Sequence, residues 1–198
     1  MKTLAELELK KIEDDQKQQF HRLNNILIKS RIKTFEQNYP LDHKEMDTVR
    51  NYLFTTDTWG LYELTLFSET VQFFDTTSYI YYCREMLHRS DFFHQLPYNS
   101  TLIQTILING LFLLSERKEL TSAAYLITTM ERLFGDTRDA FMRIVFMIAK
   151  GYYQWQKGDK TGRELIQKGI ELFDTLGYQA QSIYYQTEFQ HILNPSKI

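Results

Sequence analysis

Hydrophobic side chains recur every three or four residues along most of this chain, with charged and polar side chains between them. In residues 4–36, for example, leucine, isoleucine and phenylalanine recur at this spacing among lysine, glutamate and glutamine. Such a period is typical of amphipathic α-helices, because it places the hydrophobic side chains on one face. No stretch shows the convincing two-residue alternation of a half-buried strand. The pattern therefore predicts an all-α protein of about ten helices joined by short loops.

The ends of these helices carry local signals. Pro40 ends the first helix, and "DHKE" at 42–45 resembles a capping box, with Asp42 as the cap and Glu45 reaching back. Small polar residues predict the later helix starts, at Asp57 or Thr58, Asp75, Asn99 or Ser100, Thr121 or Ser122, and Asp136 or Thr137. Glycines predict the stops, at Gly135, Gly158 and Gly177.

Alternate helices are predicted to start near Asp57, Asn99, Asp136 and Gly177, a period of about forty residues with two helices per unit. This period lies between those of tetratricopeptide and HEAT repeats. We therefore expect residues 1–198 to form a single tetratricopeptide-like domain, a right-handed superhelix of helical hairpins. The first helix of each hairpin would line the concave face, which predicts inner helices at about 57–73, 98–115, 136–156 and 178–193.

Glycines within "GYYQWQKGDKTGRELIQKGIELF" (151–173) fit such a hairpin. Glycine inside a helix costs about 1 kcal/mol relative to alanine, so it needs a packing reason. Gly151 is expected to let the following helix approach closely, with Tyr152 and Trp155 filling the space between hairpins. Gly158 would form the turn, and Gly169 would be the small residue on the second helix.

Composition narrows the class of protein. The chain has 198 residues, of which 43% are hydrophobic and 15% aromatic, with only 8 glycines and 3 prolines. This supports a sizeable core and disfavours β-sandwiches. The formal net charge is −2, so the basic surface of a nucleic-acid-binding domain is missing. The N-terminus has no apolar signal-peptide region and no segment is long enough to span a membrane, so we expect a cytoplasmic protein.

Residues that carry chemistry form no recognisable active site. The histidines are scattered without metal-ligand spacing, at His21, His43, His88, His94 and His191. The single cysteine, Cys83, lies on an apolar helix face and is expected to be buried and inert. Neither a glycine-rich phosphate loop nor a nucleophile elbow occurs. We therefore expect no enzyme activity, no cofactor and no metal site.

Two stretches resemble the C-terminal domain of the Rgg/GadR/MutR family, which are transcriptional regulators of low-GC Gram-positive bacteria. They are "YLFTTDTWGLYELTLFSETVQFF" (52–74) and "GYYQWQKGDKTGRELIQKGIELFDTLG" (151–177), and the most specific part is Trp59, Gly60, Tyr62 and Glu63. The resemblance extends over about residues 1–193. It implies a tetratricopeptide-like domain that binds a short secreted peptide in the cytoplasm and forms a homodimer. The family's N-terminal helix-turn-helix domain, through which DNA would be bound, is absent from this chain.

The chain departs from the family pattern where a Gly-Asn pair and a later arginine often occur. The corresponding residues here are Ser68, Glu69 and Gln72, whereas the asparagine common on the next inner helix is present as Asn109. If that arginine holds an acidic group of the peptide, this chain lacks the contact and Glu69 would repel the group. A neutral or basic ligand, or none, is therefore expected.

The expected peptide-binding residues lie on the inner helices: Tyr62, Glu69, Gln72, Asn109, Phe141, Arg143, Met147 and Lys150. Glu69, Gln72 and Asn109 would hydrogen-bond the peptide backbone, and Arg143 with Lys150 would hold a carboxylate. Phe141 and Met147, with Phe146, would line an apolar floor. The structural alternatives are a solvated polar face for the charged residues, a local backbone bond for Asn109 and ordinary core packing for Phe141 and Met147.

Two functions are compatible with these patterns. The first is the ligand-sensing and dimerisation domain of a quorum-sensing transcriptional regulator, which would bind a short apolar peptide in its concave groove. The second is a stand-alone scaffold that docks a helix or tail of a partner protein and senses nothing.

Overall fold

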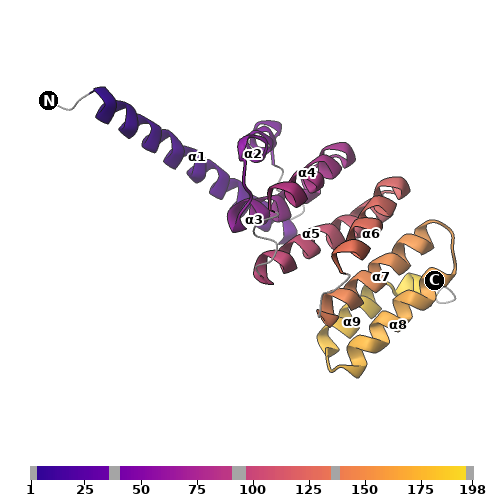
Figure 1. The fold of residues 1–198 in the computed structure, drawn as a ribbon. Helices are drawn as coiled ribbons and strands as arrows, with labels where there is room; N and C mark the ends of the chain where they lie inside the picture. The colour runs from indigo at the N-terminus through magenta and orange to yellow at the C-terminus, as the bar shows by residue number, and fades with distance from the viewer. Residues whose placement is uncertain (1–3, 36–40, 91–96, 135–138, 195–198) are drawn as a thin grey trace. The chain divides into compact units, whose positions relative to one another are not determined.

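Helices make up every regular element in the part of the chain that the computed structural model describes, which is residues 4–35, 41–90, 97–134 and 139–194 (Figure 1). The all-α prediction is confirmed. Contacts between backbones divide the chain into two compact units, Met1–Phe74 and Asp75–Ile198. The single continuous domain over 1–198 stays a prediction.

Three α-helices and one short 3-10 helix lie in the described residues of the first unit. These are α1 (Leu4–Phe35), α2 (His43–Thr55), α3 (Leu61–Thr70) and η1 (Val71–Phe73). Its core includes a chain of edge-to-face rings, in which Trp59 contacts Phe67 at 5.7 Å between centroids and Phe67 contacts Phe74 at 5.5 Å. All three side chains are buried, so they fix α3 and η1 against the end of α2.

Where the structure describes the second unit, it consists of seven α-helices. These are α4 (Thr76–Arg89), α5 (Pro97–Glu116), α6 (Leu120–Leu133), α7 (Ala140–Gln156), α8 (Thr161–Thr175), α9 (Gln179–Glu188) and α10 (Gln190–Leu193). Alternate helices α3, α5, α7 and α9 begin at residues 61, 97, 140 and 179, which follows the period read from the sequence. The bounds of the helices predicted to be inner are therefore nearly right.

Several predicted helix starts are confirmed and several are displaced. Asp42 accepts from the Glu45 backbone at 2.7 Å and Glu45 returns to the Asp42 backbone at 3.0 Å, which completes the capping box. Asp75 caps α4 through the Ser78 amide at 2.9 Å. The predicted start at Asp57 or Thr58 is wrong, because α3 begins at Leu61 and the intervening Trp59 is a buried core residue.

Later starts are displaced in a similar way. The helix α5 begins at Pro97, so Asn99 and Ser100 lie inside its first turn, where proline is well tolerated. Glu119, ahead of Thr121 and Ser122, immediately precedes α6. For α7 the cap is Asp139, which accepts from the Met142 amide at 3.1 Å. The candidates Gly135, Asp136 and Thr137 lie outside the described residues.

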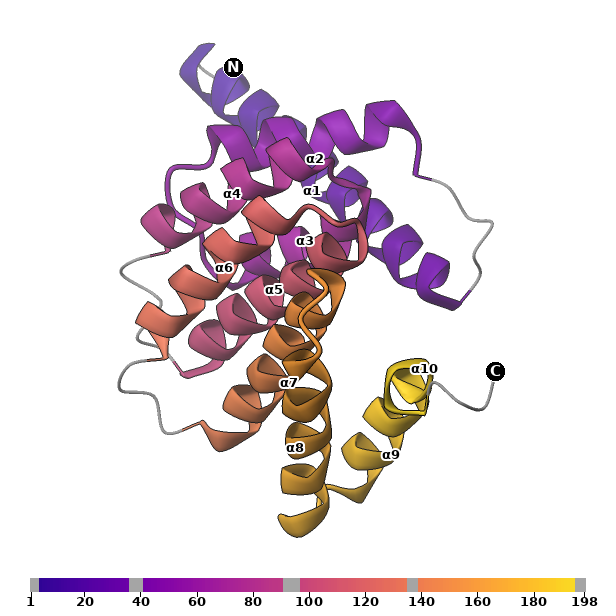
Figure 2. The same cartoon turned by 90° about the vertical axis from the view of Figure 1, so that its right-hand side faces the viewer.

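Glycines bring α7 and α8 together along their length (Figure 2). A Cβ added at Gly151 would lie 2.7 Å from the Gly162 carbonyl oxygen, and one at Gly162 would lie 2.6 Å from the Trp155 amide nitrogen. One at Gly169 would strike Cγ1 of Ile148. The predicted packing roles of Gly151 and Gly169 are therefore confirmed, since no side chain fits between these backbones.

At two other positions the backbone conformation itself requires glycine. Gly158 has φ +91° and Gly177 has φ +80°, the left-handed region that other residues avoid. Gly158 follows α7 and Gly177 follows α8, so the predicted turn and stop are confirmed.

Candidate functional site

The Trp59–Glu63 segment joins the three helices of the first unit. The Trp59 indole donates to the Leu53 carbonyl oxygen at 3.3 Å and is buried. Glu63 accepts from the Gly60 amide at 2.9 Å through one carboxylate oxygen and from the Tyr52 hydroxyl at 2.6 Å through the other. Glu63 therefore caps α3 and ties it to α2. The segment that most resembles the Rgg/GadR/MutR pattern has a structural role here.

Tyr62 packs within the same assembly. Its ring contacts Phe20 at 5.3 Å and Tyr52 at 6.0 Å between centroids, both edge to face. Its hydroxyl donates to Asn24 Oδ1 at 3.0 Å. Burial, followed by the charge of Glu63, raises the pKa of Tyr62. These contacts link α3 to α1 and occupy the groups that Tyr62 would offer a ligand.

Glu69 and Gln72 also lie in the first unit, near the junction of α3 and η1. The Glu69 carboxylate is half-buried and forms an ion pair with Arg31 of α1 at 3.1 Å. Gln72 is exposed on η1. The Arg31 guanidinium balances the charge of Glu69, so the expected repulsion of an acidic ligand by Glu69 loses its main support.

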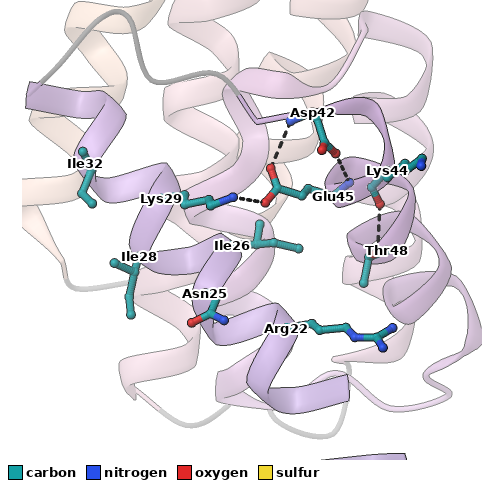
Figure 3. A pocket seen from close by; sticks show the side chains of 10 residues that line it. All are labelled: Arg22, Asn25, Ile26, Ile28, Lys29, Ile32, Asp42, Lys44, Glu45 and Thr48. Atoms are coloured by element: carbon teal, nitrogen blue, oxygen red, sulfur yellow. Dashed lines mark hydrogen bonds and ion pairs between the residues drawn. The ribbon is translucent and has the colours of Figure 1, made fainter. Parts of the chain in front are cut away.

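A hollow of about 400 Å³ lies between α1 and α2 (Figure 3). Its centre is filled by the ion pair of Lys29 and Glu45, and Glu45 is also part of the capping box with Asp42. The apolar wall consists of side chains of α1, such as Ile28, which is exposed. Its central charged groups already have partners within the chain. This arrangement favours a helix-joining contact over a ligand site.

In the second unit, a groove of about 540 Å³ lies among α5, α7, α9 and α10. We call it the inner groove. Its lining is rich in aromatic side chains and comprises Asn109, Phe112, Leu113, Glu116, Tyr152, Tyr184, Tyr185, Glu188, Phe189 and His191. These residues come from three of the four helices predicted to be inner. The groove therefore lies on helices predicted to be inner, although Asn109 is the one predicted peptide-binding residue in its lining.

Ring contacts hold the walls of the inner groove together. Phe112 of α5 lies 6.2 Å from Tyr152 of α7 and 6.5 Å from Tyr185 of α9, between ring centroids. Phe189 lies 5.2 Å from Tyr152 and 6.1 Å from Phe112. The predicted role of Tyr152 between hairpins is confirmed. The aromatic rings give the groove an apolar floor, whereas Asn109, Glu116, Glu188 and His191 make the rest of its lining polar.

Asn109 is exposed on the wall of the inner groove. Its neighbours in the sequence, including Ile108 and Gly110, are buried. The side-chain amide carries both a donor and an acceptor, the two functions that one peptide group requires. Among the expected peptide-binding residues of this unit, Asn109 is the one that lines the inner groove.

The inner groove carries negative charge from Glu116 and Glu188, and the pKa values of two of its tyrosines are raised. Burial raises the pKa of Tyr152; its hydrogen bond from Gln156 opposes this, and the charges of Glu116 and Glu188 raise the pKa further. Burial, with a smaller effect from Tyr184, raises the pKa of Tyr185 to about 12. Both tyrosines are therefore neutral hydrogen-bonding groups at physiological pH.

A second hollow, of about 470 Å³, lies on another face of α7. We call it the outer hollow. Its lining comprises Glu131, Phe134, Arg143, Phe146, Met147, Lys150, Gln154 and Leu165. Arg143, Met147 and Lys150 thus lie together, but they face α6 and α8. On a helix with 3.6 residues per turn, Arg143 lies roughly opposite Tyr152, so it does not share the inner groove.

The cations of the outer hollow have partners within the chain. Lys150 forms an ion pair with Glu131 at 2.5 Å and lies 5.7 Å from the centroid of the Phe146 ring. Arg143 donates to the Phe134 carbonyl oxygen and lies 5.7 Å from the centroid of that ring. Both contacts stabilise the packing of α6 against α7, which differs from the solvated polar face given as the structural alternative for these residues.

Phe141 lines neither hollow. Its ring contacts Phe173 at 5.2 Å and Tyr178 at 5.5 Å between centroids, so it packs α7 against α8 and the start of α9. It is half-buried. These contacts favour the ordinary packing role over a groove floor.

Other groups are inert or unclustered. Cys83 is buried, and burial raises the pKa of its thiol to about 12, so it is not a nucleophile at neutral pH. Within the described ranges, no three histidine, cysteine, aspartate or glutamate side chains are placed to hold a metal ion. The helices of those same ranges include none with the length and apolarity needed to cross a membrane.

Sequence reasoning missed the main charged residues of the inner groove. Glu116 and Glu188 are the last residues of α5 and α9, and neither was selected as a ligand residue. They stand 72 positions apart in a chain with 25 acidic residues, so only the packing of α5 beside α7 and α9 brings them to one groove. Their shared position at the ends of predicted inner helices was the available signal.

Comparison with known proteins gives one family and several related structures. The family model for "HTH-type transcriptional regulator Rgg, C-terminal domain" matches residues 7–187. A crystal structure of the SHP pheromone receptor Rgg2 from Streptococcus dysgalactiae is similar over 93% of this chain and 68% of its own, with 24% identity and a TM-score of 0.78. A putative transcriptional regulator from Listeria monocytogenes is similar over 98% and 68%, with 19% identity and a TM-score of 0.77. At these identities the two structures establish the shared fold.

Proposed function

Because this chain belongs to the family of C-terminal domains of the HTH-type transcriptional regulator Rgg, we propose that it senses a short, mostly apolar signalling peptide. The peptide would bind in the inner groove. One observation carries this proposal: helices α5, α7 and α9 present an aromatic groove with one exposed amide, Asn109, on its wall. The similar Streptococcus dysgalactiae protein is an SHP pheromone receptor, which supports a sensing role for this chain.

The groove combines two sources of affinity. Its aromatic walls would bury apolar side chains of the peptide, which supplies most of the binding free energy. The Asn109 amide and the neutral hydroxyls of Tyr152 and Tyr185 would fix register by hydrogen bonds to the peptide backbone. The phenol groups suit this task because burial keeps them protonated.

Binding would act on transcription through a second copy of the chain. The exposed apolar side chains near and on α9 offer a contact for a homodimer, since Ile183 is 63% exposed and Leu176 54% exposed. A peptide seated against Tyr185 would bias the position of α9 and thereby the arrangement of the two protomers. DNA would be bound by the helix-turn-helix domain that the family name implies, not by residues of this domain. These steps complete the proposed quorum-sensing mechanism in the cytoplasm.

The test is thermal unfolding with and without a panel of short apolar peptides. A ligand at a hundred times its Kd stabilises the native state by about 2.7 kcal/mol. For a domain of this size that raises Tm by roughly 5–10 °C. Asn109→Ala should reduce the shift, whereas Asn51→Ala, an exposed asparagine of α2 outside the groove, should not.

The same experiment distinguishes peptide sensing from the alternative function, a protein-docking scaffold. A scaffold that docks a helix or tail of a partner protein would show no sequence-selective shift with any short peptide. Binding that survives Asn109→Ala unchanged would retain the sensing role but remove Asn109 from the site. If Gln72→Ala, and not Asn109→Ala, reduced the shift, the ligand would bind at the first unit.

A further inference from the structure

We infer that one end of the inner groove is a subsite for a positively charged group of the peptide, an ammonium or a guanidinium, held between Glu116 and Glu188. This rests on the proposed function, because the cation is taken to be an amino terminus, lysine or arginine of the bound peptide. The inference assigns a charge to the ligand, which the fold alone does not determine.

The position of the two carboxylates is the first argument. Glu116 is the last residue of α5 and Glu188 the last residue of α9, and both line the inner groove. Tyr152, one turn before the end of α7, lies close enough to both carboxylates for each to raise its pKa. The C-terminal ends of three helices therefore converge on one end of the groove.

Helix ends add to this negative charge. The last carbonyl groups of an α-helix have no partner within the helix and carry a partial negative charge, which favours cations nearby. Glu116 and Glu188 add full charges at two such ends. The groove lining contains no lysine or arginine. Arg117, the residue after Glu116, does not line the groove.

The pairing of these glutamates differs from that of the other glutamates beside hollows. Glu45 is paired with Lys29 between α1 and α2, and Glu131 is paired with Lys150 at the outer hollow. Within the described residues, no ion pair or side-chain hydrogen bond is found for Glu116 or Glu188. A cation of the ligand would pair with Glu116 and Glu188, just as lysine side chains of the chain pair with Glu45 and Glu131.

Aromatic rings complete the subsite. The rings of Phe112, Tyr152, Tyr185 and Phe189 line the groove, with neighbouring ring centroids 5.2–6.5 Å apart. Ring faces attract ammonium and guanidinium groups, and this attraction grows when water is excluded. The methylene stem of a lysine or arginine would pack on the rings while its charged end reaches the carboxylates. An acidic group at the same place would be repelled.

The experiment compares matched peptides by fluorescence anisotropy. Each is a short, labelled, leucine-rich peptide that differs at one terminal position, where it carries lysine, norleucine or glutamate. We expect the lysine peptide to bind about three to ten times more tightly than its norleucine twin at low salt. The preference should shrink at high salt, because the carboxylates are exposed.

Two double variants decide the location. In Glu116→Gln with Glu188→Gln the lysine preference should disappear while the norleucine peptide still binds. In the control, Glu164→Gln with Glu171→Gln, the same charge is removed from exposed residues of α8 outside the groove, and the preference should remain. Equal binding of the lysine and norleucine peptides to the unaltered chain overturns the subsite and leaves the peptide-sensing function standing.

If no peptide binds, the proposed function fails for this panel and a smaller probe tests the subsite alone. Arginine amide would be titrated against the chain while NMR follows the ring signals of Tyr152 and Tyr185, with acetyl-leucine amide as the neutral comparison. Shifts with arginine amide that vanish in Glu116→Gln with Glu188→Gln support the subsite. No shift, or an equal shift in that variant, overturns it.

Discussion

Gly162→Ala tests the close crossing of α7 and α8. In an open helix this change would stabilise the chain by about 0.5–1 kcal/mol, because alanine is the better helix former. Here the added Cβ would lie 2.6 Å from the Trp155 amide nitrogen and closer still to the Gly151 carbonyl oxygen. Ordinary van der Waals contact begins at about 3.4 Å, so the two helices must separate by roughly 1 Å.

The two atoms that the added Cβ would meet determine how much stability is lost. Both atoms are backbone, so no side-chain rotation can relieve the clash, and separation also loosens the buried Ile166 and Phe173 of α8. Overpacking of this kind costs about 1–3 kcal/mol. Because both atoms are backbone, the cost lies in the upper part of this range, about 2–3 kcal/mol, and subtraction of a helix-propensity gain of about 1 kcal/mol leaves a net loss of about 1–2 kcal/mol. Tm should fall by roughly 2–8 °C.

Thermal and urea unfolding followed by far-ultraviolet circular dichroism measure this loss. Gly169→Ala is the comparison, since its added Cβ meets mainly the side chain of Ile148, which can rotate away. It should therefore cost less than Gly162→Ala. If Gly162→Ala is as stable as the unaltered chain, or more stable, α7 and α8 do not cross as tightly as the structure shows.

Three further outcomes follow from buried or bonded groups. Glu63→Ala should destabilise the first unit by about 1–3 kcal/mol in urea unfolding, because the Tyr52 hydroxyl and the α3 cap lose their acceptor, whereas Asp47→Ala at an exposed pair should change little. Cys83 should resist thiol reagents at neutral pH until the chain unfolds, and rapid labelling of the native chain would contradict its burial. Tyr185 has a native pKa of about 12 against about 10 when unfolded, so its contribution to stability is complete below pH 10 and is lost between about pH 10 and 12; an ultraviolet titration that finds it ionised near pH 10 would refute this.

The sequence predicted helices well where local chemistry alone decides them. The Asp42 capping box and the left-handed glycines Gly158 and Gly177 depend on residues within a few positions, and all three were confirmed. Starts that depend on tertiary packing were displaced. Trp59, for example, inserts into the core, which delays α3 until Leu61 and leaves Asp57 outside the helix. No local signal distinguishes such an insertion from a helical turn.

Packing partners were harder to predict than packing positions. Gly151 was identified as a close-approach residue, but its counterpart Gly162 was not, although both are needed for the crossing. A glycine in the first turn of a helix is common enough to need no special explanation. Only the facing backbone of α7 shows that Gly162 has no room for a side chain.

The candidate site shows the same limit on one helix. Arg143, Met147 and Lys150 share a face of α7, as their spacing predicts, but spacing alone does not say which neighbour that face meets. The face toward α5 and α9 carries Tyr152, which was considered as packing and not as a ligand residue. The orientation of α7 about its axis is fixed by the glycine contacts with α8, which lie beyond any local pattern.

Charge complementarity therefore has to be read from contacts and not from single positions. Glu69 suggested a ligand without acidic groups, yet its ion pair with Arg31, 38 positions earlier, supplies a cation at the same place. Glu116 and Glu188 lead to a similar expectation for a different reason, since within the described residues they have no such partner and they end helices beside the inner groove. Selection of a ligand by its charge would therefore take place at the inner groove of the second unit. Neutralising Glu69 should leave the lysine preference unchanged, while neutralising Glu116 and Glu188 should abolish it.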